Sequence, residues 1–324
     1  MYSQSELKDL VEKAMVNLSF ESEAAKLIGP VKYILSIGGK RLRPVMTLMS
    51  CNLFSDKIND ALLPAIGLEI FHNYTLVHDD IMDQASVRRN APTVHTKWGL
   101  NQAILSGDVM SFYASEFIAA APVSVLSKVL KIYNRTAVEV CIGQQLDMDF
   151  EKTTYITQDE YVRMIELKTA VLIAASMKIG AIIGGSSEKD ADYISEFGRH
   201  LGLAFQIQDD LLDVYGDTIS FGKKTGGDIV TNKKTFLLLK ALELASGEQQ
   251  KLLQSLISKK DFDPEVKIQT VTEIFNQLNI RHITENLANE FINKAVGSLE
   301  KISADQERKS ELYNLVSSLN GRNI

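Results

Sequence analysis

The chain is poor in cysteine and proline and has no long uninterrupted apolar run. Its two cysteines, Cys51 and Cys141, are far apart in the sequence, which argues against a disulfide framework or a cysteine-based zinc site. No stretch of about 18 apolar residues is present to span a bilayer. The first ten residues also lack the basic start and apolar core of a secretion signal. These absences predict a cytoplasmic protein without a membrane anchor.

An excess of positive charge is also missing. The 35 Lys and Arg residues are outnumbered by 41 Asp and Glu residues, which gives a net charge of -6. A general nucleic-acid-binding protein carries a basic surface, so nucleic acid is not expected as a partner. Any anionic ligand would have to be bound by a local group of cations.

The scarcity of proline favours helices. Six prolines in 324 residues leave long segments without a helix breaker. Apolar residues recur at helical spacing, for example at Leu62, Ile66, Ile70 and Tyr74. The same spacing predicts helices over 124–150, 159–180, 190–214 and 286–299, whereas strand-like alternation is hard to find. The sequence therefore predicts an all-α fold.

The predicted breaks between helices are short. Gly38 and Gly39 interrupt an early helix, residues 184–187 separate two later ones, and residues 261–264 open another. The longest irregular stretch is predicted from Gly216 to about Thr235, and a loop of that length is usually functional or disordered. Because no low-complexity linker is present, we expect a single domain over residues 1–324.

One acidic pattern occurs twice. Both copies read DDxxD, and their carboxylates belong to Asp79, Asp80, Asp83, Asp209, Asp210 and Asp213. On a helix, the first and last of these residues share a face, and their charges repel unless a cation lies between them. Oxygen ligands without His or Cys suit magnesium, which often keeps phosphate oxygens among its ligands. A solvated helix face would explain one such motif, but it is a weak explanation for two in apolar surroundings.

Basic residues lie close in sequence to both acidic motifs. They are Lys40, Arg41 and Arg43 behind two glycines, Arg88 and Arg89 after the first motif, and Lys223, Lys224, Lys233 and Lys234 after the second. Guanidinium and ammonium groups are what diphosphate oxygens require. Each group alone is more often surface charge. Beside the carboxylates, however, these cations predict a site for diphosphate esters.

In combination, these segments resemble the trans-prenyltransferase family, the head-to-tail isoprenyl diphosphate synthases. The resemblance covers most of the chain and rests on GGKRLRP from Gly38, HDDIMD from His78, RRNAPT from Arg88, KTA from Lys168, FQIQDD from Phe205 and GKKTGGD from Gly222. It implies an isoprenoid-synthase helical bundle around a deep central cavity, usually as a homodimer. The two acidic motifs would face each other across the cavity mouth and hold three Mg²⁺ ions on the allylic diphosphate.

The resemblance also implies roles for individual residues. Direct magnesium ligands would be Asp79, Asp83 and Asp209, with Asp80, Asp210, Asp213 and Asp228 ligating or supporting through water. The allylic diphosphate would be bound by Arg88, Lys168, Lys223 and Lys233, and isopentenyl diphosphate by Lys40, Arg43, His72 and Arg89. Thr169 and Gln206 match polar residues whose oxygen atoms steady the allylic cation. The family's common RRGKPT appears as RRNAPT, so Asn90 and Ala91 depart from it at positions without a chemical role.

The implied reaction is an ionisation, a condensation and an elimination. The allylic C–O bond ionises, and the double bond of isopentenyl diphosphate, held about 3 Å away, attacks the cation. A proton then leaves. No Ser-His-Asp or Cys-His nucleophile is needed, so His72 is interpreted as a phosphate donor, with a core or surface histidine as the alternative. His78 either hydrogen-bonds a ligand carboxylate or is structural.

Residues just before Asp79 are expected to form the floor of an apolar tunnel for the product. On a helix, Thr75 lies about 6 Å and Tyr74 about 7.5 Å from Asp79, and Phe71 about a turn further on. In the family that the chain resembles, bulky side chains at this depth stop elongation early. One aromatic here, in a motif without the two-residue insertion of many bacterial farnesyl diphosphate synthases, therefore implies geranylgeranyl diphosphate (C20) as the product. Farnesyl diphosphate (C15) is the alternative, and an ordinary core role for Tyr74 stays open.

Two other protein classes stay open. A class I terpene cyclase shares the first DDxxD, but its second metal motif mixes Asn, Ser or Thr with Glu, and it has no use for Lys40 and Arg43. A non-catalytic synthase subunit tends to lose Asp or Arg from the motifs, and none is lost here. The sequence therefore predicts an active enzyme whose partners are isopentenyl diphosphate and an allylic diphosphate.

Overall fold

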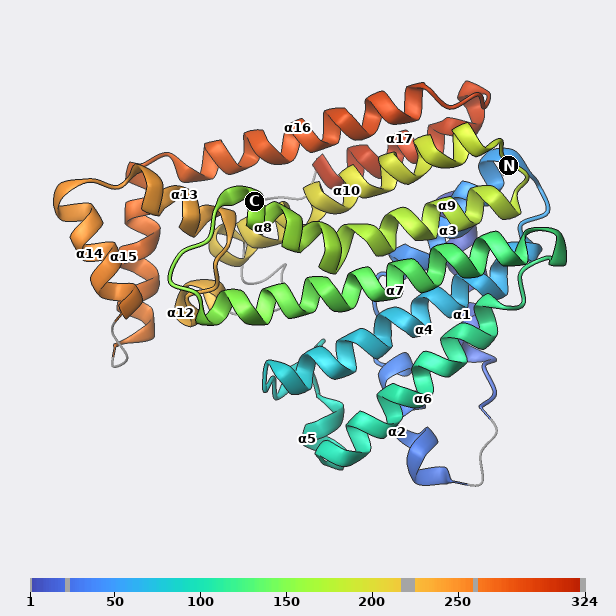
Figure 1. Cartoon of the computed structure of the whole chain (residues 1–324), viewed down its shortest axis with the longest axis horizontal. Coiled ribbons are helices and arrows are strands. Elements are labelled where there is room, and N and C mark those ends of the chain that lie inside the picture. Colours follow the sequence, from blue (N-terminus) through green and yellow to red (C-terminus); the bar gives the residue numbers. More distant parts are fainter. Residues whose placement is uncertain (1, 21–23, 217–224, 259–261, 321–324) are drawn as a thin grey trace. The chain divides into compact units, whose positions relative to one another are not determined.

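The computed structural model describes residues 2–20, 24–216, 225–258 and 262–320. These residues form helices and one short two-stranded hairpin (Figure 1). The predicted all-α fold is therefore confirmed. The predicted diphosphate-binding residue Lys223 and its neighbour Lys224 lie outside the described residues.

The chain divides into two compact units. The first comprises Met1–Arg135, Ala175–Ser195 and Lys301–Leu312, and the second comprises Thr136–Ala174, Glu196–Glu300 and Tyr313–Ile324. Four helices contribute residues to both units: α7 (Val123–Lys152), α9 (Val171–Ile183), α10 (Glu188–Tyr215) and α17 (Gln306–Asn320). Each unit is described below by itself. The single domain over 1–324 and its central cavity stay predictions.

The first unit is built around α4. Its other elements are α1 (Gln4–Val16), α2 (Ala25–Ser36), α3 (Leu42–Phe54), β1 (Val87–Arg88), β2 (Ala91–Pro92), α5 (Val94–Trp98) and α6 (Leu100–Ile118). Helix α4 (Asn59–Met82) packs against α3 and α6, and its Ile66, Leu68 and Ile70 side chains are completely buried. A helix that is apolar on several sides belongs to a core, where each such side chain contributes about 1.5–3 kcal/mol. This core helix ends in the first acidic motif.

The second unit has a core of its own. Its elements are α8 (Gln158–Ile165), a π-helical turn (Glu166–Ala170), α12 (Gly227–Thr231), α13 (Phe236–Leu244), α14 (Gly247–Ser258), α15 (Pro264–Gln277) and α16 (Ile280–Glu300). Leu211 of α10, Leu237 of α13, Leu253 of α14 and Phe275 of α15 meet in one buried apolar cluster. This cluster supports the segment that follows the second acidic motif.

Most predicted helices are found, with two differences. Helices α4, α7, α10 and α16 cover the segments predicted to be helical, but the segment 159–180 is divided by the π-helical turn. The stretch from Gly216 to Thr235, predicted to be irregular, contains the short helix α12. Local propensity does not indicate α12, because the helix depends on a tertiary contact: the Asp228 backbone N–H in its first turn donates to the Asp213 side chain.

The hairpin after the first motif depends on a tight turn. Val87 pairs with Pro92 and Arg88 with Ala91, and the two turn residues, Arg89 and Asn90, have φ values of 51° and 60°. Two successive positive φ values characterise the type I′ turn, in which Asn is well tolerated. Asn90 therefore preserves the turn where the common family pattern has glycine.

Candidate functional site

The first acidic motif lies at the C-terminal end of α4. Asp79 is partly buried, Asp83 is exposed as the residue that caps the helix, and Asp80 is completely buried. The helix therefore directs Asp80 into the protein, while Asp79 and Asp83, four residues apart, share an accessible face. The predicted pair of direct magnesium ligands is available on this unit.

Asp80 holds the predicted diphosphate-binding residue Arg88. Its Oδ1 atom accepts a hydrogen bond of 2.7 Å from Nε of Arg88, which begins the turn of the hairpin. Burial raises the pKa of Asp80, and the Arg88 charge opposes that rise. The other carboxylate oxygen, Oδ2, is buried without a hydrogen-bond partner among the described residues. Asp80 thus acts through Arg88 in this structure, and not as a solvent-facing ligand.

One of the three cations in the GGKRLRP segment is structural. Arg41 is 4 % exposed, adopts a left-handed backbone conformation, and donates to Glu69 at 2.9 Å and to the Leu35 carbonyl at 2.7 Å. Its neighbours Lys40, which is exposed, and Arg43, which is partly buried, remain the candidates for binding isopentenyl diphosphate.

Arg89 and His72 lie in the same cationic neighbourhood. The Arg89 guanidinium donates to the Gly38 carbonyl, and a Cβ atom on Gly39 would lie 2.9 Å from its Cζ atom. Gly39, at φ 146°, therefore permits this close approach. Burial, with the charges of Arg43 and Arg89, holds the pKa of His72 well below its usual value. A neutral imidazole among cations suits donation of a hydrogen bond to a phosphate oxygen.

Aromatic rings follow α4 away from the first motif. The Tyr74 ring lies 4.9 Å from the His78 ring and 5.5 Å from the Phe71 ring, and Phe71 packs edge-on against Tyr133. Thr75 donates to the His72 carbonyl at 2.8 Å, a bond within the helix. The three predicted chain-length residues are thus neighbours on one helix, with Phe71 more deeply buried than Tyr74.

His78 faces α6. Its Nε2 atom lies 3.4 Å from the Ile104 carbonyl and 3.9 Å from the Asp108 carboxylate, and its ring lies against Gly107. These contacts favour the structural interpretation of His78 over a bond to a ligand carboxylate.

In the second unit, the π-helical turn carries Lys168 and Thr169. A glycine on each of two neighbouring helices, α7 and α10, lies against the backbone of this turn. A Cβ atom on Gly143 of α7 would lie 2.3 Å from the backbone nitrogen of Lys168, and a Cβ atom on Gly202 of α10 would lie 2.7 Å from Cα of Ala170. Both neighbouring helices can therefore approach the backbone of the turn closely. Such π-turns occur frequently at functional sites.

The two predicted residues on this turn contact different helices. Lys168 forms an ion pair of 2.6 Å with Asp147 of α7. Thr169 donates a hydrogen bond of 3.1 Å to Oε1 of Gln206 on α10. Thr169 and Gln206 are thus neighbours, and Asp147 lies beside the predicted residue Lys168.

The second acidic motif repeats the arrangement of the first. Asp209 and Asp213 are partly buried, whereas Asp210 is 3 % exposed and accepts from the Tyr161 hydroxyl at 2.5 Å and from Nε2 of Gln206 at 3.0 Å. Burial raises the pKa of Asp210 to about 7. In both motifs, the middle aspartate points inward and orients a neighbouring polar side chain.

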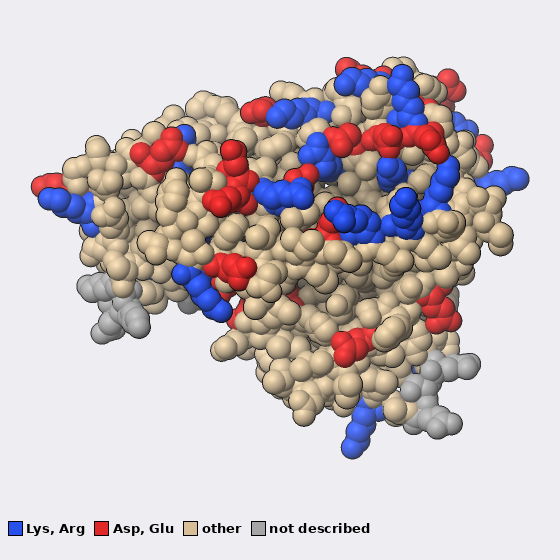
Figure 2. Space-filling view, viewed as in Figure 1, with Lys and Arg blue, Asp and Glu red and all other residues tan. Residues whose placement is uncertain are grey.

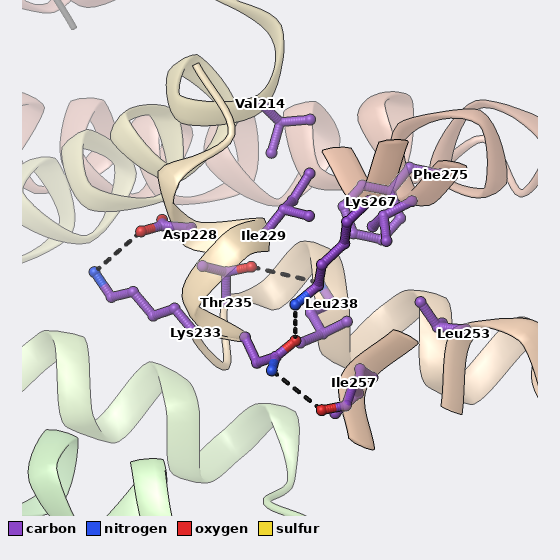
Figure 3. Close-up of a pocket in the computed structure, with 12 residues that line it drawn as sticks. Val214, Asp228, Ile229, Lys233, Thr235, Leu238, Leu253, Ile257, Lys267 and Phe275 are labelled. Carbon is purple, nitrogen blue, oxygen red and sulfur yellow. Dashed lines mark hydrogen bonds and ion pairs between the residues drawn. The ribbon is translucent and has the colours of Figure 1, made fainter. Parts of the chain in front are cut away.

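Helix α12 brings two further predicted residues together. The Asp228 backbone N–H donates to Oδ2 of Asp213 at 2.9 Å, and Nζ of Lys233 lies 3.8 Å from Oδ1 of Asp228 (Figure 3). Asp213, Asp228 and Lys233 therefore form one connected group in the second unit.

Comparison with known proteins identifies the family. A sequence model described as polyprenyl synthetase matches residues 24–275. The chain belongs to the polyprenyl synthetase family. The trans-prenyltransferase predicted from the motifs is thereby confirmed, and the terpene cyclase alternative loses its support.

Individual polyprenyl synthetases are similar over most of the chain. Geranylgeranyl diphosphate synthase of Sulfolobus acidocaldarius is 36% identical over 289 residues, which are 88% of this chain and 87% of that protein. A short chain isoprenyl diphosphate synthase of Methanocaldococcus jannaschii is 40% identical over 80% of each chain. The crystal structure of geranylgeranyl pyrophosphate synthetase from Pyrococcus horikoshii has a TM-score of 0.91 at 33% identity, covering 99% of this chain and 97% of that one.

The carboxylate ligands of this polyprenyl synthetase fit a magnesium ion whose remaining ligands are oxygen atoms of the substrate diphosphate. Within the described part of the chain, no group of three or more His, Cys, Asp or Glu side chains is gathered for a metal. Magnesium is often bound by one or two carboxylates and several phosphate oxygens, so pairs such as Asp79 and Asp83 suit it.

Within the described residues, no helix is both long and apolar enough to cross a membrane.

Two polar residues of this site were not predicted from the sequence. Asp147 gave a usable signal, because it lies in a polar segment at one end of a helix otherwise rich in apolar residues. Tyr161 gave none, since a tyrosine in an amphipathic helix is ordinarily a core residue. Its hydrogen bond to Asp210 depends on a contact between distant parts of the sequence.

Proposed function

We propose that this polyprenyl synthetase condenses isopentenyl diphosphate with an allylic diphosphate to give geranylgeranyl diphosphate. The observation that carries the proposal is the shared arrangement of the two acidic motifs. In each, the first and last carboxylates are accessible, while the middle one orients a polar side chain, Arg88 or Gln206. The names of the relatives support the C20 product, and Tyr74 before the first motif agrees with it.

The residues assigned to the metal and the diphosphates belong to both units. Magnesium held by Asp79, Asp83, Asp209 and Asp213, with Asp228 in support, would neutralise charge on the allylic diphosphate. Among the described residues assigned to that diphosphate, three cations each have an acidic neighbour: Asp80 for Arg88, Asp147 for Lys168 and Asp228 for Lys233. Lys40, Arg43, His72 and Arg89 are assigned to isopentenyl diphosphate.

The proposed reaction needs no nucleophilic side chain. The allylic C–O bond breaks and its electron pair leaves with diphosphate, the double bond of isopentenyl diphosphate forms the new C–C bond, and a proton passes to the departing diphosphate. Gln206 is oriented for the cationic stage, because Asp210 accepts from its Nε2 atom and its Oε1 atom faces Thr169. The oxygen atoms of these side chains can therefore face developing positive charge.

A product assay tests the proposal. Purified protein with Mg²⁺ and isopentenyl diphosphate is incubated with dimethylallyl, geranyl or farnesyl diphosphate in separate reactions, and the dephosphorylated products are measured by mass spectrometry. We expect a dominant C20 alcohol. A dominant C15 alcohol would favour the farnesyl alternative. Absence of elongation with every starter would point to a non-catalytic subunit that needs a partner.

We also propose that the protein is a homodimer that associates through α6. Leu105 and Phe112 are seven residues apart on this helix and are 56% and 73% exposed. The surface over α6 carries few charges in the view of Figure 2. Exposed apolar side chains grouped on one helix face mark interaction surfaces, and a second copy presents the matching apolar face.

The dimer proposal predicts the effect of a charge on α6. Phe112→Asp is expected to shift the protein from twice the mass of one chain to a single chain in analytical ultracentrifugation, because an unpaired carboxylate would be buried at the interface. The matched control is Val16→Asp, a change at a similarly exposed apolar residue on α1. A monomeric unaltered protein, or an unchanged mass for the Phe112 variant, would contradict the assignment.

We further propose that the protein is located in the cytoplasm, which is a reducing compartment. It is supported by the two free thiols of Cys51, which is buried, and Cys141, which is exposed. Exposed free thiols persist in reducing compartments and are readily oxidised elsewhere. Fractionation of cells that express the protein would test the location.

A further inference from the structure

Lys267 of α15 is a nearly completely buried lysine whose ammonium group makes specific contacts. It is 1% exposed, and its Nζ atom donates to the Asn232 side-chain oxygen at 2.7 Å (Figure 3). The same atom also donates to the Val230 carbonyl at 3.1 Å. The same atom lies 4.1 Å above the Phe262 ring. Burial of an ammonium group is costly unless hydrogen bonds compensate it, so these contacts define where Lys267 can sit.

The contacts of Lys267 converge on the end of α12. Asn232 has a left-handed backbone conformation with φ 57°, and its side chain also donates to the Ile257 carbonyl at 3.1 Å. This conformation reverses the chain immediately after the helix, so that the Lys233 backbone N–H returns to the Asp228 carbonyl at 2.9 Å. The reversal places the Lys233 ammonium 3.8 Å from the Asp228 carboxylate.

Helix α12 needs support at both ends. It has five residues, too few for an isolated helix to be stable in water. At its first turn, the Asp228 N–H is bonded to the Asp213 carboxylate. At its last turn, the Val230 carbonyl has no partner within so short a helix, and the Lys267 ammonium donates to it. A cation at the C-terminal end also interacts favourably with the helix dipole.

The space around these contacts does not suit a separate ligand. The adjoining cavity is about 10 Å³ and is lined by apolar side chains of α13, α14 and α15 together with the α12 segment (Figure 3). Such a volume holds about one water molecule. The contacts of Lys267 therefore serve the arrangement of α12, and not binding in this cavity.

We propose that Lys267 is a positioning residue that, through Asn232 and the end of α12, holds Asp228 and Lys233 in place for the allylic diphosphate. The inference rests on the proposed function of these two residues. Lys267 acts from the far side of α12 and binds no substrate itself. Isopentenyl diphosphate is assigned to Lys40, Arg43, His72 and Arg89, none of which lies on α12 or α15. Its binding should therefore be insensitive to Lys267.

The test is a comparison of the two Michaelis constants in Lys267→Met. This change keeps the apolar stem and removes the ammonium group. We expect the KM for the allylic diphosphate to rise about 10-fold, as loss of a charged hydrogen bond predicts, while the KM for isopentenyl diphosphate changes by less than about twofold. The Mg²⁺ concentration for half-maximal rate should rise as well. Lys267→Arg, which retains a cation, should recover part of the loss.

Two further variants keep the result interpretable. Asn232→Gly retains the freedom for positive φ but removes the side-chain acceptor, and it should raise the same KM without a further rise in the double variant with Lys267→Met. Lys309→Met is the matched control, because Lys309 of α17 is also buried, at 2% exposure. It should leave both Michaelis constants unchanged, whatever its effect on thermal stability.

The outcomes separate the inference from the proposed function. An unaltered protein that elongates no starter would overturn the proposed function and the inference with it. If the unaltered protein elongates normally, then a folded Lys267→Met variant with both Michaelis constants unchanged would overturn the inference alone, even if its Tm fell. Should Lys267→Met fail to fold, Asn232→Gly decides by the same comparison.

Discussion

Replacement of Asp79 with alanine is expected to lower kcat by a factor of about 100 to 1,000. This is the usual effect of removing one preorganised electrostatic group from an active site. Asp79 is a partly buried, accessible residue at the end of α4, and its side chain is not among the buried apolar side chains of that helix, such as Phe71 and Val77. The fold should therefore persist. Steady-state kinetics with a saturating allylic diphosphate and a Mg²⁺ titration would measure the loss.

A matched change on the same helix controls for effects on folding. Asp60→Ala removes an exposed aspartate from the first turn of α4. A carboxylate in that position stabilises the helix by about 0.3–1 kcal/mol through its interaction with the helix dipole. This variant should lose a little stability and keep its turnover. Near-normal turnover of Asp79→Ala, with circular dichroism identical to that of the unaltered protein, would remove the assigned metal role.

Replacement of Tyr74 with alanine is expected to move the dominant product to a longer chain. Tyr74 lies five residues before Asp79, and its ring is the first large side chain that a growing product would meet on this face of α4 under the proposed tunnel. Phe71, three residues earlier, would then form the next barrier about 4.5 Å deeper along the helix. The added length should therefore be limited, and mass spectrometry of the dephosphorylated products would measure it.

Two variants sharpen this experiment. Tyr74→Phe keeps the ring and should leave the product length unchanged, because the hydroxyl is not part of the barrier. Phe71→Leu together with Tyr74→Ala should lengthen the product further, since leucine keeps most of the buried volume while it removes the ring that packs on Tyr133. An unchanged product in Tyr74→Ala would show that Tyr74 is a core residue and not the floor.

The sequence predicted the helices and the two acidic motifs because both signals are local. Apolar spacing defines α4 and α10, and a DDxxD pattern on a helix fixes which carboxylates share a face. The inward direction of Asp80 and Asp210 was not predicted. Spacing alone places each of them about 100° from the first aspartate, without stating which side of the helix meets the core.

Residues that act through distant contacts also escaped prediction. In the sequence, Lys267 looks like any other charged residue on an amphipathic helix. Its contact with Asn232 joins two segments that are separated in the chain by α13 and α14. Tyr161 is hidden for the same reason, because only the tertiary structure brings its hydroxyl to Asp210. Helix α12 could not be found either, since tertiary bonds and not intrinsic propensity hold its ends.

The π-helical turn at Glu166–Ala170 makes the chain sensitive to length at that point. A π-turn accommodates one residue more than the α-helix around it, so deletion of a single residue would let α8 and α9 join as one regular helix. The residues on either side would keep their facing, because the extra residue is absorbed within the turn, but the residues of the turn itself would change their positions. Lys168 and Thr169 could no longer meet Asp147 and Gln206 together. Variation in this segment is thus restricted in residue number more severely than in residue type.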